Sequence, residues 1–239
     1  MTDRLEALWL HLGDSPLLYL SLTLVAYQIG LYCYEKSGRK PLVNPLPIAV
    51  VLIITVLLLT GTSYERYFEG AYFLHFLLGP ATVALAIPLY RQFDKVRRSA
   101  FAILVSLLIG SITSVVSSVL IAWVLGGSEM SFLSLAPKSV TTPVAMGITE
   151  VLGGIPSLTA VLVVITGILG ATLGPLVLNL VGVKGWAARG LAIGTAAHGL
   201  GTARKLQVNE EAGAFSGLAM GLNALATAIL LPIVWFWLF

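Results

Sequence analysis

The feature that most constrains this chain is a series of long segments that contain no Asp, Glu, Lys or Arg. Six of these segments are long enough to cross a bilayer: 15–34, 41–64, 70–90, 99–128, 151–183 and 212–239. A helix needs about 20 apolar residues to cross a hydrocarbon core of roughly 30 Å at 1.5 Å per residue. The pattern therefore predicts a polytopic α-helical membrane protein.

The composition agrees with a lipid environment. Hydrophobic residues make up 57% of the chain and charged residues only 10%, whereas soluble domains have about 25% charged residues. The single Cys33 excludes a disulfide framework within the chain. No nucleophile with a base, metal-ligand cluster, nucleotide loop or basic stripe is apparent, so we expect no enzyme, cofactor, metal site or nucleic-acid binding.

Two further uncharged segments, 139–149 and 190–203, are too short for a comfortable crossing. Unpaired backbone polar groups are not tolerated against lipid. These segments are therefore expected to be half-helices, re-entrant segments or short packed helices. The expected fold is all-α, with about six long transmembrane helices plus these two short pieces, preceded by an uncleaved N-terminal leader over residues 1–14.

Basic residues collect in cytoplasmic loops, which gives an orientation. The basic loops at 36–40 and 91–98 are predicted to be cytoplasmic, and this places the N-terminus outside. If segment 139–149 dips into the membrane and returns, the loop with Lys184 and Arg189 is cytoplasmic and the loop 204–211 is external. If the segment crosses, these two assignments are exchanged. We favour the dip.

Two membrane segments are interrupted by small residues and proline in corresponding places of the chain. The first carries Gly79, Pro80 and Pro88, and the second carries Gly194, Gly199 and Gly201. Each is followed by a charged loop and then an Ala-Phe pair that opens a long helix. These features predict a single integral membrane domain over 1–239 with repeat-like halves at about 15–128 and 137–239. The two halves have opposite orientations in the membrane if segment 139–149 dips. Interrupted helices in corresponding positions are typical of a transporter site at the membrane midplane.

Polar residues gather between apolar stretches in segment 137–156. They are candidates for substrate binding: Lys138, Ser139, Thr141, Thr142 and Pro143. A hydroxyl-rich half-helix that begins beside a lysine suits a carboxylate, since free N–H groups, the helix dipole and the ammonium all favour an anion. In the alternative interpretation, Lys138 extends to the membrane interface and the threonines cap the helix.

Two ionisable side chains are candidates for proton coupling. Glu150 is either a coupling carboxylate in a wetted cavity or, as we favour, a loop carboxylate at the membrane edge. His198 lies among small residues, where an imidazole either binds substrate and carries a proton or fills a packing position. Asn179 and Asn223 are expected to join helices by hydrogen bonds.

Four long motifs resemble the LrgB/CidB family of bacterial membrane proteins. They are LLGPATVALAIPLYRQ at 77–92, PKSVTTPVAMGITEVLGGIPSLTA at 137–160, RGLAIGTAAHGLGTARKLQ at 189–207 and GAFSGLAMGLNALATAILLPIV at 213–234. The resemblance extends from about residue 44 to the C-terminus. It implies a multi-pass protein of the bacterial inner membrane.

The resemblance implies two functions. Plastid relatives are glycolate/glycerate transporters and some bacterial pairs are linked to pyruvate uptake, so the favoured function is a secondary transporter of small monocarboxylates, acting with a small LrgA/CidA-like membrane partner. The alternative is a holin-like or antiholin-like regulator of murein hydrolase activity and autolysis with no solute path of its own. Homo-oligomerisation is left open. The motif positions selected for substrate binding are Thr82, Lys138, Thr141, Thr142, Pro143, His198 and Thr202.

Overall fold

The structure, a computed structural model, describes residues 16–40, 43–84 and 86–238, and all regular elements in these ranges are α-helices. The helices form two compact units, unit 1 up to residue 84 and unit 2 from residue 85 onward. The expected all-α polytopic fold is confirmed. The first predicted repeat-like half, at about 15–128, extends across the boundary between the units. The repeat stays a prediction.

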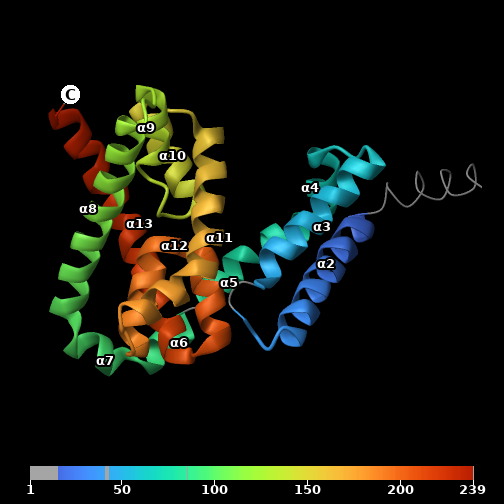
Figure 1. Ribbon diagram of the computed structural model, residues 1–239, viewed down its shortest axis with the longest axis horizontal. Coiled ribbons are helices and arrows are strands. Elements are labelled where there is room, and N and C mark those ends of the chain that lie inside the picture. Colours follow the sequence, from blue (N-terminus) through green and yellow to red (C-terminus); the bar gives the residue numbers. More distant parts are fainter. Residues whose placement is uncertain (1–15, 41–42, 85, 239) are drawn as a thin grey trace, which may run out of the picture. The chain divides into compact units, whose positions relative to one another are not determined.

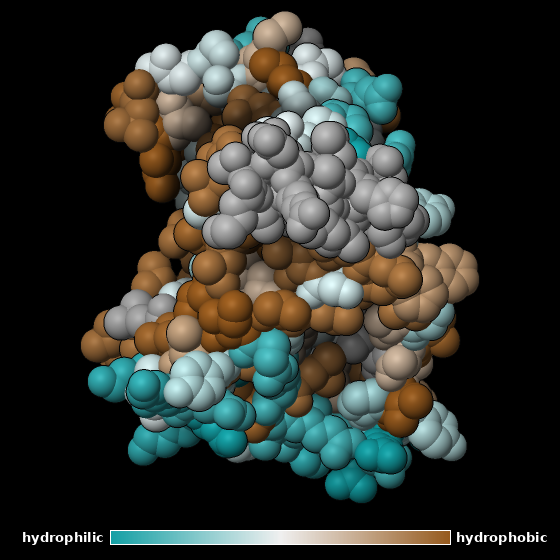
Figure 2. All heavy atoms as spheres, turned by 90° about the vertical axis from the view of Figure 1, so that its right-hand side faces the viewer, coloured by the Kyte–Doolittle hydropathy of each residue, from teal (hydrophilic) through white to brown (hydrophobic). Residues whose placement is uncertain are grey.

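Within the described residues, five helical stretches are long and apolar enough to cross a membrane. They are Leu17–Lys36, Tyr64–Arg91, Ala100–Val124, Pro156–Leu180 and Glu210–Trp237. Large apolar side chains are exposed along them, as lipid contact requires. Brown, hydrophobic side chains are prominent on the face drawn in Figure 2.

Unit 1 is built around one helix that packs against two others. Its helices are α2 (Pro16–Lys36), α3 (Pro45–Thr60), α4 (Tyr64–Phe76) and α5 (Leu78–Ala84). The backbone of Pro45 lies so close to Gly30 that a methyl group at Gly30 would be 2.5 Å from the Pro45 carbonyl oxygen. The Thr23 and Tyr67 hydroxyls are 2.9 Å apart and link α2 to α4.

One of the six expected long spans is shorter than predicted. Segment 41–64 was expected to cross as one helix, but α3 has only 16 residues, about 24 Å at 1.5 Å per residue. Asn44 caps its N-terminus by accepting a hydrogen bond from the Leu46 N–H. Gly61 ends it in the left-handed conformation, with φ of 64°, which glycine adopts without steric penalty.

Unit 2 contains three long helices and two hairpins (Figure 1). Its helices are α6 (Ala86–Arg91), α7 (Phe93–Arg98), α8 (Ala100–Val124), α9 (Glu129–Leu135), α10 (Thr142–Leu152), α11 (Pro156–Leu180), α12 (Trp186–Val208) and α13 (Glu210–Leu238). We call the end of unit 2 that carries α7 the basic end. The other end, at the α8–α9 connection, is the opposite end.

The α9–α10 hairpin enters unit 2 from the opposite end and returns to it. Ser134, just before the tip, lies beside the chain that follows α10, because the Ile155 N–H donates to Ser134 Oγ at 2.9 Å and the Thr159 hydroxyl donates to the Ser134 carbonyl at 2.9 Å. The tip is the irregular segment 136–141 between the two helices. Between Ser134 and Ile155, a stretch that contains segment 139–149, the chain therefore leaves one point and returns beside it, as the favoured dip requires.

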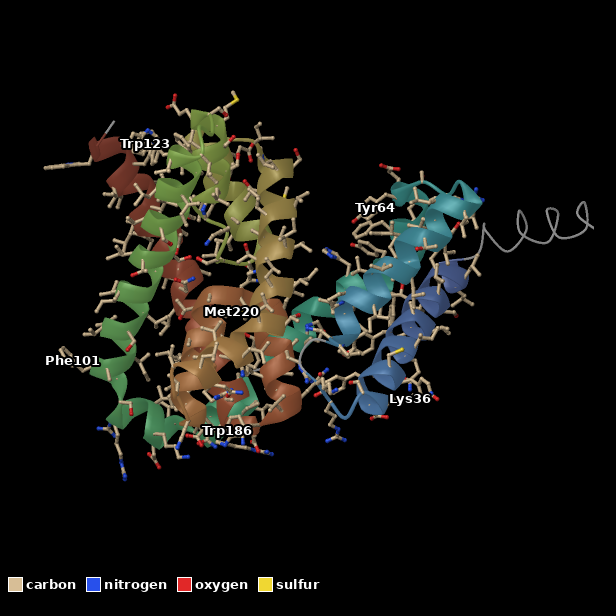
Figure 3. The ribbon with its side chains drawn as sticks, viewed as in Figure 1. Lys36, Tyr64, Phe101, Trp123, Trp186 and Met220 are labelled. Carbon is tan, nitrogen blue, oxygen red and sulfur yellow. The ribbon has the colours of Figure 1, made fainter. Side chains whose placement is uncertain are left out.

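The second hairpin is formed by α12 alone and enters from the basic end. His198 interrupts the helix with φ of 40° and ψ of −134°. The chain reverses there, because Gly201 lies against Ile193 and Ala197, eight and four residues earlier. Figure 3 shows Trp186 at the base of this hairpin and Met220 of α13 near its upper end. The expected short intramembrane piece at 190–203 is thus a re-entrant helical hairpin.

The α12 hairpin overturns one predicted loop position. With a dipping segment 139–149, loop 204–211 was expected on the side away from Lys184 and Arg189. Instead it lies at the basic end, where Glu210 pairs with Arg91 and Glu211 pairs with Lys95, each at 3.1 Å. The reason is that segment 190–203 reverses at His198 instead of crossing.

Glycines allow the α12 hairpin to pack closely on its neighbours. On α11, Gly167 and Gly170 face the hairpin. A methyl group at Gly167 would lie 2.7 Å from His198 Cε1, and one at Gly170 would lie 2.5 Å from the Ala197 methyl group. Towards α13, Gly194 lies directly against the Ser216 main chain. This close approach of backbones is how small residues drive helix association in membranes.

Candidate functional site

The two hairpin tips are joined by one buried amide on α13. Asn223 Nδ2 donates to the Ser139 carbonyl on the α9–α10 hairpin and to the Thr195 carbonyl on the α12 hairpin, each at 3.2 Å. The expectation that Asn223 joins helices is confirmed. The junction lies midway between the basic and opposite ends, since one hairpin reaches it from each end.

This junction contains two polar oxygens without a partner. Asn223 Oδ1 and Ser139 Oγ are buried and make no hydrogen bond, and each residue is 1% exposed. Buried polar groups in proteins are nearly always hydrogen-bonded, so an unpaired one needs an explanation such as a ligand. The amide oxygen can only accept a hydrogen bond, whereas the hydroxyl can donate or accept one.

Lys138 at the tip of the α9–α10 hairpin supplies a positive charge beside the junction. Its Nζ donates to Ser114 Oγ on α8 at 3.1 Å, and no carboxylate pairs with it within the described part of the chain. An unpaired ammonium inside a membrane protein is costly and usually marks a functional site. The arrangement is therefore suited to an anion.

A cavity of about 380 Å³ adjoins this ammonium, between α8 and the first arm of the α12 hairpin. Small and polar residues form much of its wall: Ser106, Gly110, Ser114, Ala188, Ala192, Thr195 and Ala196, with Leu178, Val183 and Leu191. Ser114 accepts the hydrogen bond from Lys138, and the Thr195 carbonyl accepts one from Asn223. The wall of the cavity thus includes Val183 near the basic end and two residues, Ser114 and Thr195, that are bonded to Lys138 and Asn223.

His198 forms the tip of the α12 hairpin and is held by main-chain contacts. It is 4% exposed, and its Nε2 lies 2.9 Å from the Val163 carbonyl oxygen on α11. Because a carbonyl oxygen only accepts hydrogen bonds, Nε2 carries the proton. Positive φ is unusual for a residue other than glycine and marks a position that its surroundings over-determine.

The other predicted site residues of unit 2 lie in varied surroundings. Thr202 is fully hydrogen-bonded, to the His198 carbonyl and to Ser216 Oγ, each at 2.9 Å, so it serves packing in this conformation. Thr141 precedes α10 and caps it without a side-chain hydrogen bond. Thr142 is half-buried, and Pro143 and Glu150 are exposed.

The interrupted-helix residues are divided between the two units. Gly79, Pro80 and Thr82 lie on α5 in unit 1, and Pro88 lies on α6 in unit 2. Gly194 and Gly201 are packing positions of the α12 hairpin, and a methyl group at Gly199 would meet only the Met220 sulfur at 3.7 Å. The break in the helix is at His198 itself.

Sequence reasoning selected none of the ten residues that line the cavity, and so missed its three polar ones, Ser106, Ser114 and Thr195. A signal was available in α8, where Ser106, Gly110 and Ser114 recur every four residues within an apolar helix and so share one face. No such pattern distinguished Thr195. Asn179 was expected to join helices, and it does so by accepting a hydrogen bond from Arg189 at 2.8 Å.

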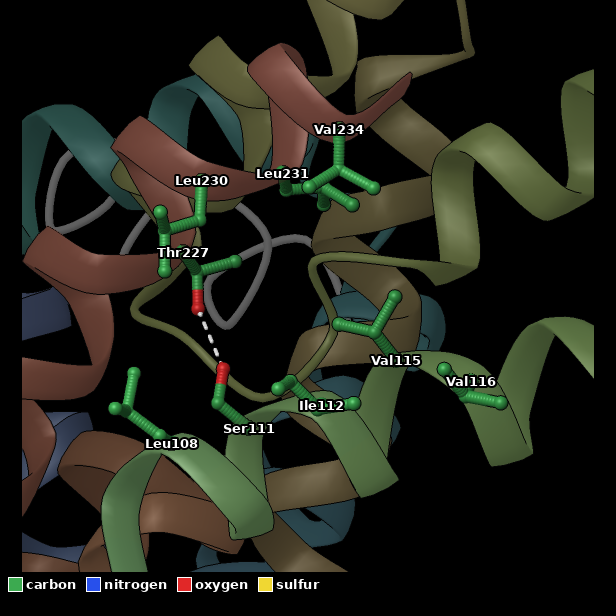
Figure 4. A pocket seen from close by; sticks show the side chains of 9 residues that line it. All are labelled: Leu108, Ser111, Ile112, Val115, Val116, Thr227, Leu230, Leu231 and Val234. Atoms are coloured by element: carbon green, nitrogen blue, oxygen red, sulfur yellow. Dashed lines mark hydrogen bonds between the residues drawn. The ribbon is translucent and has the colours of Figure 1, made fainter. Parts of the chain in front are cut away.

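A second pocket of unit 2, between α8 and α13, is apolar (Figure 4). Its volume is about 130 Å³, and its polar groups, the hydroxyls of Ser111 and Thr227, are 3.3 Å apart. No group of three or more His, Cys, Asp or Glu side chains able to hold a metal ion occurs among the described residues.

The chain matches the LrgB-like family model over residues 23–237. A Bacillus subtilis (strain 168) protein named uncharacterized protein YwbG is 37% identical over 89% of this chain and 94% of its own length. Holin-like protein CidB of Staphylococcus epidermidis is 35% identical over 91% of this chain and 94% of its own. Antiholin-like protein LrgB of Bacillus mycoides is 35% identical over 91% of this chain and 95% of its own length.

No solved structure matches this chain. The family model covers most of the sequence, and the relatives align over nearly their whole length. Together with the membrane-spanning helices, these matches show that the chain is a multi-pass bacterial membrane protein and belongs to the LrgB-like family.

Proposed function

We propose that this chain is a secondary transporter of small monocarboxylates, in the class of pyruvate, glycolate and glycerate, that acts with a small LrgA/CidA-like membrane partner. The observation that carries the proposal is the Lys138 ammonium, which has no carboxylate partner in the described part of the chain and donates to Ser114 on the wall of the cavity, beside two hairpin tips. The proposal assigns no enzymatic step to the chain and places the N-terminus outside.

The charge of the site supports an anionic solute. A carboxylate bound at Lys138 would neutralise its ammonium and form a charge-assisted hydrogen bond, which is shorter and stronger than a neutral one. Ser139 Oγ and Asn223 Oδ1 are two further groups whose hydrogen-bonding capacity is unused. A short carboxylic acid with an oxygen substituent offers groups that can satisfy them.

The arrangement of the hairpins supports a transport cycle. The two tips come from opposite ends of unit 2, and both are hydrogen-bonded at 3.2 Å to the Asn223 amide. Such bonds are long for N–H···O and can be exchanged at modest cost. Movement of one hairpin away from Asn223 would open the junction to one end, which is the requirement for alternating access.

The test is uptake of radiolabelled pyruvate, glycolate and glycerate into proteoliposomes under an inward proton gradient. Wild-type protein is compared with Lys138→Met, which removes the ammonium, and with Lys184→Met, which removes an exposed lysine outside the site. Loss of a hydrogen bond to a charged group should lower uptake by about tenfold to a hundredfold. Lys184→Met should transport like the wild type.

The partner requires a separate arm of this experiment. The chain is reconstituted alone and together with an LrgA/CidA-like protein. Saturable uptake in either preparation that is lost in Lys138→Met supports the transporter. Absence of uptake in both preparations, with folded protein in the membrane, would reject it.

A second candidate is a regulator of murein hydrolase activity and autolysis without a solute path. It is favoured by the names of the relatives, which are called holin-like and antiholin-like. A regulator predicts that Lys138→Met alters neither uptake nor the lysis phenotype of cells that express it. Measuring autolysis and uptake in the same strains therefore separates the two candidates.

A further inference from the structure

A second unpaired cation lies at the base of the α12 hairpin, away from the hairpin tips. Lys205 is only 3% exposed and has neither a hydrogen bond nor an ion pair in the part of the chain that the structure describes. Lys205 is close to Arg189 on the other arm: Gly201 lies against Ile193 across the hairpin, and Lys205 and Arg189 are each about one helical turn further from the tip. Lys205 lies seven residues beyond His198, about 10 Å along the second arm.

Arg189, on the first arm of the same hairpin, also keeps an unused donor. Its Nη1 donates to Asn179 Oδ1 at 2.8 Å and to the Val183 carbonyl at 2.7 Å, and its Nη2 donates to the Pro175 carbonyl at 3.4 Å. These acceptors are neutral, so they hold the guanidinium in place without neutralising it. The remaining Nε is buried and has no partner.

The carboxylates that follow the hairpin are already paired with other residues. Glu210 pairs with Arg91 and Glu211 pairs with Lys95, each at 3.1 Å. Two neighbouring cations with low exposure and no counter-charge repel each other and pay a desolvation penalty. A bound anion offsets both the repulsion between the cations and the cost of their desolvation. The free Arg189 Nε–H and the Lys205 ammonium are donors that would hold it.

We propose that Arg189 and Lys205 form a binding site for a phosphate group at the basic end of the α12 hairpin. A phosphate group has several acceptor oxygens, so it can accept from the Arg189 Nε–H and from the Lys205 ammonium at the same time. The group belongs either to free phosphate or to the headgroup of an anionic phospholipid. This site is separate from the junction of the tips and does not depend on transport.

The test measures the thermal unfolding midpoint of the purified chain in neutral detergent micelles. One arm titrates inorganic phosphate against chloride at constant ionic strength. The other titrates phosphatidylglycerol against phosphatidylcholine. Wild type is compared with Lys205→Met, which removes the buried charge, and with Lys184→Met as the control, because Lys184 is an exposed lysine at the same end.

We expect a saturable rise of the midpoint in the wild type and in Lys184→Met with one of the two phosphate sources, and the responding arm identifies the source. Lys205→Met should need on the order of tenfold more of the same ligand. If Lys205→Met does not fold, Lys205→Gln, which keeps a polar side chain without charge, replaces it. The proposal is overturned if neither source raises the wild-type midpoint, or if the Lys205 variant responds at the same concentration as the control.

Discussion

Alanine at Gly194 should destabilise unit 2 strongly, whereas alanine at Gly199 of the same hairpin should not. A methyl group at Gly194 would meet the main chain of Ser216 on α13, 2.8 Å from its carbonyl carbon and Cα and closer still to its oxygen. Backbone atoms within a helix cannot turn aside as a side chain does. A methyl group at Gly199 would have the Met220 sulfur as its nearest neighbour, at the ordinary distance of 3.7 Å.

The size of the effect follows from these distances. Carbon atoms pack best at about 3.5–4.0 Å, so α12 and α13 must separate by about 1 Å to accept a methyl group at Gly194. A gap of about this size removes roughly a quarter to a half of the energy of each dispersion contact between the two helices. Overpacking of this kind costs about 1–3 kcal/mol, and we expect about 3 kcal/mol because the neighbour is backbone. Gly199→Ala should change stability by less than about 1 kcal/mol, in the stabilising direction, since alanine favours a helix.

The assay is the thermal unfolding midpoint of the two purified variants in the same detergent. A loss of about 3 kcal/mol corresponds to a midpoint roughly 10 °C lower for a chain of this size. Equal midpoints for Gly194→Ala and Gly199→Ala would refute the reasoning. That result would mean that the first arm of the hairpin does not lie against α13.

Three further predictions concern the hairpins. Thr202→Val keeps the side-chain shape but removes two hydrogen bonds, so it should lower the stability by about 1–2 kcal/mol, measured by chemical denaturation. Asn223→Asp replaces a donor by a carboxylate that faces two main-chain carbonyl oxygens, and its unfolding midpoint should fall further than that of Thr202→Val. In a cysteine-free background, a membrane-impermeant thiol reagent should label Lys184→Cys and Glu210→Cys from one side of the membrane and Glu129→Cys from the other. Labelling of Lys184→Cys and Glu210→Cys from different sides would contradict the re-entrant α12.

The placement of membrane helices could be predicted from the sequence with good accuracy. Long uncharged runs identify spans because no lipid-exposed helix tolerates repeated charges. The error in segment 41–64 came from local capping: Asn44 and Gly61 end α3 on both sides although the surrounding residues stay apolar. Polarity alone does not define helix ends, since capping depends on backbone conformation.

The candidate site was predictable only in part. Lys138 was selected because it stands at the start of a hydroxyl-rich half-helix, and in the structure it donates to Ser114, which lines a cavity. Thr202 was selected only from its position in a family motif, and in the structure its hydroxyl is hydrogen-bonded to the His198 carbonyl and to Ser216 Oγ. Which polar groups remain unpaired depends on the partners that packing supplies, and these come from distant parts of the chain.

By itself, the sequence determined that this protein is a bundle of membrane helices with two short irregular segments, because hydrophobic length and backbone hydrogen bonding are local properties. Only the tertiary structure decided that both segments reverse direction and that Asn223 joins their tips. The physical reason lies in contacts between distant residues. The reversal at His198 is held by Val163 on α11 and by the close approach of α13 at Gly194, and no local pattern encodes that packing.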